Sequence, residues 1–336
     1  MGNYKVGDEK DQYIRKYQRE DVNEKLANIL GDEFRRYRID FAKTQNYLET
    51  KFVPDFPITV ALGQINRCNL NCIMCYKKYH QEPRKELSLK IIKKIIAECK
   101  KNNLSSIELS MGGESLICKH AKEVIQMVGD SGIKDVFLTT NGVFMNDEII
   151  KLVIKNKITR VRISLDAATD ETYKKIRLGA PALEKVEENL IKLIDYKKQF
   201  NSLLPTIRLS FVVMDINKHE VNAFLAKWKD KVDCIDFQRY IDFSFMDKEP
   251  EKIDSEVIKN SLCPYPFYML TIWADGNISP CCSFYGRKLI FGNIYKDNLK
   301  DVWNSSKIKA IRKQIASKKF NKICQACLYF RDRELK

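Results

Sequence analysis

The stretch 67-RCNLNCIMCYKK-78 decides the fold, because it places three cysteines within eight residues. Cys68, Cys72 and Cys75 follow the spacing C-x3-C-x2-C, and Tyr76 comes directly after the third cysteine. A metal ion or a cubane iron–sulfur cluster usually takes four protein ligands. Three thiolates on one loop therefore indicate a [4Fe–4S] cluster whose fourth iron is open to another molecule, because an open coordination position is how a metal centre binds and activates a ligand. The alternative is a closed zinc site with His80 as the fourth ligand.

The composition predicts a cytoplasmic protein with metal or redox chemistry. The chain has 336 residues and 11 cysteines. Disulfides are rare in a reducing compartment, so clustered cysteines point to metal binding. No apolar run approaches the roughly 18–20 residues needed to cross a bilayer, which predicts no membrane span. The polar start is not a secretory signal, and Val6 breaks the myristoylation pattern.

The formal net charge is +15. One interpretation is an anionic partner, such as a phosphorylated metabolite, an acidic peptide or nucleic acid. The other is a lysine-rich composition with solvated helix faces. The lysines are spread along the chain, which favours the second interpretation.

Strand and helix patterns alternate from residue 57 onward. The predicted strands are 58–65, 105–110, 135–142, 160–167, 206–214 and 234–240. The predicted helices between them are 87–103, 118–131, 146–156, 170–199 and 218–230. Repeated β-α units imply a parallel sheet with right-handed connections. Six units are too few for a closed eight-stranded barrel, so we expect an α/β fold with a partial (β/α)6 barrel and its functional loops at the carboxyl ends of the strands.

Four segments make up the expected domain organisation. Residues 1–56 form a helical N-terminal arm, with 10–50 helical and divided at Gly31; it either caps the main domain or binds substrate. Residues 57–241 form the barrel, and the charged segment 242–262 is a linker. Residues 263–336 form a small domain with a hairpin turning at Asp275-Gly276, a basic helix over 298–319 and a final C-x2-C.

The cysteine loop followed by an aromatic residue resembles the motif of the radical S-adenosylmethionine (SAM) superfamily. The resemblance implies that the amine and carboxylate of SAM chelate the open iron. One electron from the cluster then cleaves the sulfonium to a 5′-deoxyadenosyl radical, which abstracts a hydrogen atom from substrate, so the cofactor carries the difficult chemistry. A reductase, flavodoxin or ferredoxin would supply the electron.

Further stretches of the chain match the same superfamily in order, and the resemblance spans residues 58–240. They are MGGES (111–115), TTNG (139–142), ISLDA (163–167) and FVVM (211–214). By resemblance MGGES contacts the amine of the methionine moiety, and Arg177 pairs with its carboxylate. Ser164 and Asp166 lie near the ribose and the methionyl moiety, and FVVM and Tyr76 lie at the adenine. The resemblance implies these cofactor-binding residues: Tyr76, Gly112, Gly113, Glu114, Asn141, Ser164, Asp166 and Arg177.

A second group of cysteines lies near the carboxyl end: Cys263, Cys281, Cys282, Cys324 and Cys327. Together with the hairpin they resemble the SPASM/twitch extension of the same superfamily. The spacing Gly276-x4-Cys281 selects Cys281 over Cys282 as a ligand. The resemblance then implies one closed auxiliary [4Fe–4S] cluster, which accepts an electron from a substrate radical or supports the structure. A structural zinc site is the alternative, since four cysteines with a C-x2-C also describe one.

Three cysteines remain. Cys99 lies on the apolar face of a predicted helix and is expected in the core. Cys118 and Cys234 lie near predicted strand ends. Each is either a hydrogen-atom donor to a substrate radical or a small buried apolar residue.

Two enzyme functions compete. The first is oxidation (dehydrogenation) or epimerisation of a carbohydrate or related small metabolite, phosphorylated if the basic charge reaches the site. The second is modification of a ribosomal peptide, although the arm at 1–56 is too short and too helical for a winged-helix leader-binding domain. A distant alternative is a non-catalytic metal-binding or nucleic-acid-binding protein. The basic helix lacks a recognised nucleic-acid motif and interleaved aromatic residues, so nucleic acid is not favoured as a partner.

Overall fold

A curved sheet of parallel strands organises the computed structural model, which describes residues 5–6, 15–80, 82–244 and 261–332. Consecutive strands along the chain are neighbours and run parallel. They are β3 (Thr59–Leu62), β4 (Ser106–Glu108), β5 (Asp135–Thr140), β6 (Arg160–Ser164), β7 (Thr206–Val213) and β8 (Cys234–Arg239). All six predicted strands are confirmed. Within the described residues the other neighbour of β3 is β9, and the other neighbour of β8 is β2. Strands β3 and β8 therefore do not pair with each other, and the barrel is open, as expected.

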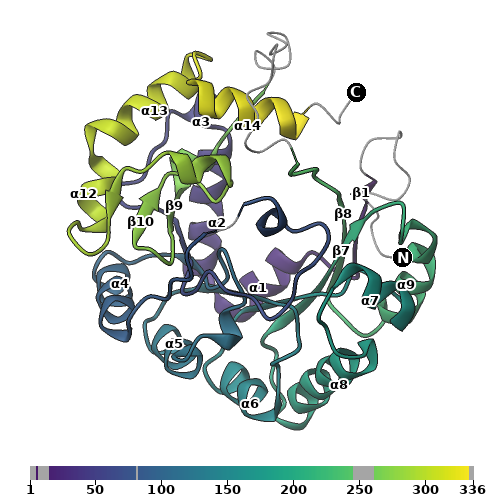
Figure 1. Cartoon of the computed structure of the whole chain (residues 1–336). Helices are drawn as coiled ribbons and strands as arrows, with labels where there is room; N and C mark the ends of the chain where they lie inside the picture. The colour runs from purple at the N-terminus through teal and green to yellow at the C-terminus, as the bar shows by residue number, and fades with distance from the viewer. Residues whose placement is uncertain (1–4, 7–14, 81, 245–260, 333–336) are drawn as a thin grey trace.

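Helices cover the outer face of this sheet (Figure 1). They are α4 (Leu89–Lys101), α5 (Ala121–Gly129), α6 (Asp147–Lys155), α7 (Asp170–Ile176), α8 (Leu183–Gln199) and α9 (Val221–Trp228). Short 3-10 turns lie at η1 (Tyr76–Lys78), η2 (Ser115–Ile117) and η3 (Lys218–Glu220). Alternate strand residues such as Ile107, Leu138 and Ile163 are buried in one core with these helices. This packing leaves the other strand face for the barrel interior.

The prediction of one helix over 170–199 is wrong. The chain leaves α7 at Arg177 and begins α8 at Leu183. Gly179 has a φ of +83°, a left-handed conformation that glycine adopts without a steric penalty. Pro181 follows, and proline lacks the backbone N–H that a continuous helix would need there.

The N-terminal arm consists of α1 (Val22–Leu30), α2 (Asp32–Gln45) and α3 (Tyr47–Thr50), and the predicted division at Gly31 is confirmed. The prediction that the helical region begins near residue 10 is wrong, because β2 (Arg15–Gln18) pairs antiparallel with β8, and β1 (Lys5–Val6) pairs with β2. An unpaired edge at β8 offers backbone donors and acceptors, and pairing with them overrides local helix propensity.

The C-terminal part continues the same sheet. It contains α11 (Tyr265–Tyr268), β9 (Met269–Ile272), β10 (Asn277–Ser279), η4 (Tyr285–Lys288), β11 (Gly292–Asn293), α12 (Leu299–Asn304), α13 (Ser306–Ala316) and α14 (Lys322–Asp332). The hairpin is confirmed, with Gly276 at a φ of +85°. β9 lies parallel to β3, so the described strands form one eleven-stranded sheet.

The predicted single basic helix over 298–319 is two helices. It is interrupted at Ser305, whose hydroxyl accepts a hydrogen bond from the backbone N–H of Ile308 and so caps α13. Most of the predicted linker 242–262 lies outside the described residues, because only 242–244 and 261–262 are described.

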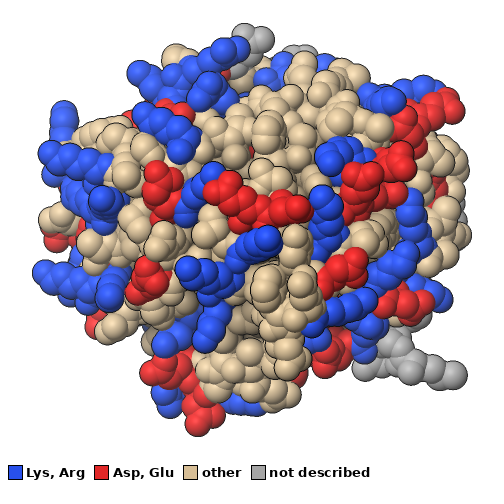
Figure 2. All heavy atoms as spheres, turned by 90° about the horizontal axis from the view of Figure 1, so that it is seen from below, with Lys and Arg blue, Asp and Glu red and all other residues tan. Residues whose placement is uncertain are grey.

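The surface charge is mixed. Figure 2 shows lysine and arginine side chains interspersed with aspartate and glutamate over the face that it presents. On this face the positive side chains form no separate block. None of the helices in the described ranges has the length and apolar character needed to cross a bilayer.

Candidate site between two cysteine sets

The first cysteine loop follows β3 and ends in η1. Cys68 is exposed, whereas Cys72 and Cys75 are half-buried. Asn141 Nδ2 lies 3.8 Å from Cys68 Sγ, and Arg177 Nη1 lies 3.9 Å from Cys72 Sγ. Burial raises the pKa of Cys72 to about 11, while the Arg177 charge opposes that rise. Donors near the sulfurs offset thiolate charge, so the surroundings fit a thiolate-bound cluster.

Arg177 and Asp166 form a buried ion pair. Asp166 Oδ1 accepts a hydrogen bond of 2.7 Å from the backbone N–H of Val212, and Arg177 Nε donates to Leu165 O at 3.2 Å. Asp166 has a φ of +63°, which costs free energy and is retained where the surroundings require it. The two residues are therefore brought together beside Cys72. Arg177 has a protein carboxylate as its partner, in addition to any cofactor carboxylate.

Glu114 is buried beside the TTNG motif. Its carboxylate accepts hydrogen bonds from Thr140 Oγ1 and Asn141 N, both at 2.8 Å, and from Leu116 N at 3.2 Å. Burial raises its pKa and these hydrogen bonds oppose the rise. The sequence placed Glu114 and Asn141 at one cofactor, and the structure brings them into direct contact.

The two glycines before Glu114 pack closely against the loop that carries the first cysteines. A Cβ on Gly113 would lie 2.4 Å from the carbonyl oxygens of both Ile65 and Arg67, which leaves no room for a side chain. Gly112 has a φ of +82°, and its carbonyl accepts from Lys77 Nζ at 2.9 Å and from Tyr76 Oη at 3.4 Å. The loop that carries the three cysteines and the glycine-rich motif therefore form one unit.

Tyr76 connects this unit to the C-terminal part. Its ring lies 5.3 Å from the Phe284 ring and 6.2 Å from the Phe243 ring. The expected place beside an adenine is thus partly taken by aromatic neighbours. Ser164 ends β6 and is half-buried.

The second cysteine set lines a cavity of about 290 Å³. The cavity is lined by Cys263, Cys281, Cys282, Cys324 and Cys327, and also by Tyr76, Met111, Asp242 and Phe243 of the barrel. Ser283 Oγ lies 3.1 Å from Cys327 Sγ, and Asn321 Nδ2 lies 3.3 Å from Cys324 Sγ. A Cβ on Gly286 would lie 2.1 Å from Cys281 Sγ, so glycine makes room for that sulfur. These residues fit a cluster site.

Across the ranges that the structure describes, no three His, Cys, Asp or Glu side chains gather closely enough to hold a single metal ion.

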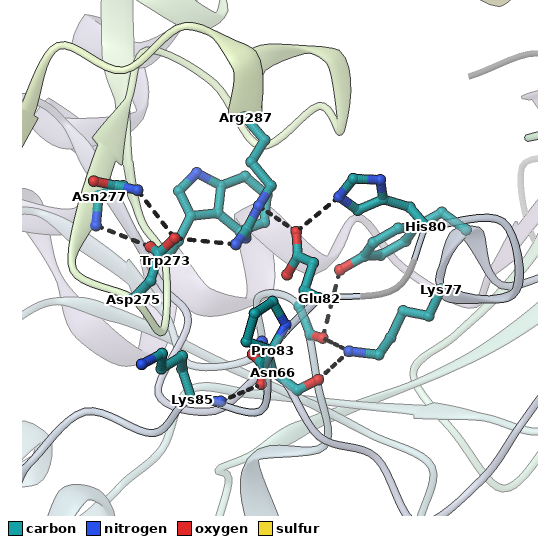
Figure 3. Close-up of polar contacts among 12 residues, drawn as sticks. Asn66, Lys77, His80, Glu82, Pro83, Lys85, Trp273, Asp275, Asn277 and Arg287 are labelled. Carbon is teal, nitrogen blue, oxygen red and sulfur yellow. Dashed lines mark hydrogen bonds and ion pairs between the residues drawn. The ribbon is translucent and has the colours of Figure 1, made fainter. Parts of the chain in front are cut away.

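Figure 3 shows a charged cluster between the first loop and the C-terminal hairpin. The Glu82 carboxylate pairs with Arg287 and lies 3.3 Å from His80 Nε2. Arg287 also contacts Asp275 Oδ2 at 3.2 Å and lies over the Trp273 ring at 4.6 Å. These side chains are mostly buried, with 16% of Arg287 and 9% of Glu82 exposed. The cluster therefore ties the segment after the first cysteines to the element that carries Gly286.

The remaining predicted candidates lie elsewhere. Cys118 lies 3.3 Å from Glu86 Oε1 and lines a different cavity. Cys234 begins β8, at the amino end of the strand, and packs with Val22 and Leu26 of α1. Neither lines the cavity between the cysteine sets. Cys99 is buried on α4, as expected.

Sequence reasoning named Cys282 and set it aside in favour of Cys281, and the structure places both cysteines in the cavity wall. It missed Asp242 and the Glu82–Arg287 pair. Asp242 and the ion pair gave no signal, because their significance depends on contacts between distant parts of the chain.

An open parallel α/β barrel with a three-cysteine loop after its first strand defines a radical SAM fold. Residues 64–221 match the radical SAM superfamily, and residues 263–328 match SPASM, an iron-sulfur cluster-binding domain. The chain is a member of the radical SAM superfamily and carries a SPASM domain. Its cofactors are accordingly a [4Fe–4S] cluster and SAM in the first domain, with auxiliary iron–sulfur in the second.

Curated relatives match part of the chain. A probable GTP 3′,8-cyclase of Methanocaldococcus jannaschii is 35% identical over 166 residues, which cover 49% of this chain and 53% of that protein. The same enzyme name belongs to a Methanococcus maripaludis (strain C5) protein that is 32% identical over 160 residues, covering 47% of this chain and 51% of that one. The chain thus spans about half the length of these relatives.

Solved structures share the fold at low identity. BtrN in complex with AdoMet and 2-DOIA has a TM-score of 0.51 and 15% identity, covering 80% of this chain and 91% of its own. SuiB of Streptococcus suis bound to precursor peptide SuiA has a TM-score of 0.55 and 16% identity, covering 82% and 70%. Native anSMEcpe with AdoMet and Kp18Cys peptide has a TM-score of 0.56 and 15% identity, covering 82% and 96%. These likenesses concern the fold alone.

Proposed function

We propose that the protein removes a hydrogen atom from a carbohydrate or related small metabolite and oxidises it. The observation that carries the proposal is the shared cavity, which is lined by Tyr76 and Met111 beside the first cysteine loop and by the second cysteine set. A substrate there would lie between a source of radicals and an electron acceptor.

The cluster and SAM, when bound, supply one-electron cleavage of the sulfonium and a 5′-deoxyadenosyl radical that accepts the hydrogen atom. Cys68, Cys72 and Cys75 hold that cluster. Gly113 keeps the glycine-rich motif against the loop, because a side chain would collide with Ile65 and Arg67. The Asp166–Arg177 pair places a guanidinium beside Cys72.

Oxidation of a carbinol removes one hydrogen atom, one proton and one electron. Water would take the proton, and an auxiliary cluster bound in the SPASM domain would supply an acceptor for the electron. We assign Cys263, Cys281, Cys324 and Cys327 as its ligands. Cys281 is buried, and its sulfur lies in the space that a side chain at Gly286 would fill.

Modification of a peptide is a second candidate, and the lining of the cavity favours it. Phe243, Tyr265, Trp273 and Phe284 line the cavity, and aromatic surfaces of this kind accept apolar side chains.

The proposal is tested by anaerobic purification and reconstitution. We expect about eight irons per chain, as two [4Fe–4S] clusters require, and 5′-deoxyadenosine after addition of SAM and a strong reductant. SAM cleavage that persists unchanged in Cys72→Ala would contradict the assignment. About four irons with one zinc would contradict the auxiliary cluster. Candidate sugars and peptides deuterated at the reacting carbon separate the two substrate classes, because only the true substrate transfers deuterium to 5′-deoxyadenosine.

A further inference from the structure

Among the described residues, the wall of the cavity between the cysteine sets contains one carboxylate and no cationic side chain. Among the described residues that line it, Asp242 is the one acidic or basic side chain. Asp242 follows β8 and is half-buried, and its Oδ1 accepts a hydrogen bond of 2.8 Å from the backbone N–H of Ser244. The remaining wall is made of apolar and aromatic side chains and cysteines.

Three cations from the elements around the cavity have partners. Lys77 donates to the carbonyls of Gly112 and Asn66. Arg287 pairs with Glu82 and Asp275. Arg177 pairs with Asp166. None of these three side chains is part of the cavity wall that the structure describes.

Bound clusters would make the cavity more negative. Each cluster is held by thiolates, whose charge outweighs that of the iron–sulfide core. A half-buried carboxylate in the wall of such a site attracts a cation more strongly than it would in bulk water, because the local dielectric is lower. An anion would meet repulsion from Asp242 and would find no cationic side chain in the described wall.

We propose that the substrate presents a protonated amine to Asp242 and a flat or apolar face to the aromatic wall. The substrate class is therefore an amine-bearing small metabolite and not a phosphorylated one. This inference rests on the proposed function, since it assigns the substrate of the same cavity. It argues against one of the two interpretations of the net charge of +15, that of a phosphorylated partner.

The test compares three probes that share one ring: benzylamine, benzyl alcohol and benzoate. Their affinities for the reconstituted, cluster-loaded protein are measured anaerobically by calorimetry. We expect benzylamine to bind at least tenfold more tightly than benzyl alcohol, and benzoate to bind most weakly. Asp242→Asn should abolish the preference for the amine, and Asp242→Glu should restore it.

Asp215→Asn is the matched control. Asp215 lies just after β7 with its side chain 97% exposed, so this change removes the same charge outside the cavity. It should leave the preference intact. No measurable binding of benzylamine, equal or tighter binding of benzoate, or an unchanged preference in Asp242→Asn with full iron content would overturn the inference.

The same samples are assayed for SAM cleavage without any probe. Loss of cleavage in the wild type would refute the proposed function. A missing amine preference with normal cleavage would refute the charge assignment alone.

Discussion

The two cysteine sets are built in different ways. Cys68, Cys72 and Cys75 come from one loop. The second set is assembled from three segments, around residues 263, 281–282 and 324–327, and meets in an apolar cavity. The first set is encoded locally, and its spacing alone identified it. The second depends on packing, so substitutions distant in sequence can disturb it.

The largest effect should come from removing one ligand of each set. Cys72→Ala should abolish 5′-deoxyadenosine formation and retain the auxiliary iron. Cys324→Ala should retain SAM cleavage and lose the auxiliary iron, because its four thiolates belong to a separate cluster. Each variant should keep about four irons. Iron analysis and chromatography of the nucleoside products check this, and loss of all iron in either variant would contradict the independence of the sets.

A smaller effect should follow from adding one methyl group at each set. A Cβ on Gly286 would lie 2.1 Å from Cys281 Sγ, so Gly286→Ala should lower the auxiliary iron content. A Cβ on Gly113 would lie 2.4 Å from two backbone carbonyl oxygens beside the first loop. Gly113→Ala should therefore weaken SAM binding with auxiliary iron intact, and each change should cost about 1–3 kcal/mol of stability.

Equilibrium binding of SAM and iron content separate these two variants. If Gly286→Ala weakened SAM binding while its auxiliary iron stayed full, the assignment of Gly286 to the second set would be wrong.

A still smaller effect should come from the charged cluster of Figure 3, which connects the segment after the first cysteine set to the turn beside the second set. Arg287→Met leaves the mostly buried Glu82 without its cation, which costs about 3–5 kcal/mol when a buried pair is broken. We expect a shifted reduction potential of the auxiliary cluster, measured by redox titration with electron paramagnetic resonance. Lys288→Met removes the same charge from the same 3-10 turn and should leave the potential unchanged. Equal shifts in both variants would argue for a general charge effect.

The smallest effect on SAM cleavage should come from a substitution at the amino ends of the parallel strands, far from both cysteine sets. Asp233 pairs with Lys25 of α1 at 2.8 Å and accepts from Ile207 N, also at 2.8 Å. Asp233→Asn should lower the free energy of unfolding by about 1–3 kcal/mol while iron content and SAM cleavage stay unchanged. Thermal unfolding of the loaded protein measures the loss.

The pH dependence of that loss follows from the pKa of Asp233. Burial alone would raise this pKa, but the hydrogen bonds from Lys25 and Ile207 outweigh it and lower the pKa. The stabilisation is therefore present above the unfolded pKa of about 3.9 and is lost only as the pH falls through the lower folded value. The difference between the wild type and Asp233→Asn should stay constant from about pH 8 to pH 5. A difference that shrinks within this range would contradict the lowered pKa.

Much of the fold was predictable because hydrophobic periodicity is local. All six parallel strands and the hairpin turn lie where the pattern placed them. The failures came from contacts that a local pattern does not contain. Arg15–Gln18 is a strand because the edge of β8 is available to it, and the helix over 170–199 divides where Gly179 and Pro181 interrupt it.

The candidate site was predictable to the extent that its motifs are contiguous. Glu114 and Asn141 touch, as do Asp166 and Arg177, although the sequence did not show that they are hydrogen-bonded to one another. Asp242 could not be singled out, because its place in the cavity wall depends on how β8 ends opposite the hairpin. The positions of the cysteines in the sequence predicted two sets. They did not predict that residues beside the first set and the cysteines of the second set line one cavity.

The parallel pairing of β3 with β9 has a consequence for electron transfer. β3 leads into the first cysteine loop, and β9 leads into the hairpin before Cys281, with Ala61 paired to Thr271 and Leu62 to Ile272. A shift of this pairing by one residue would move one set relative to the other by about 3.3 Å. The distance that an electron crosses between the two cysteine sets is therefore fixed by the hydrogen-bond register between β3 and β9.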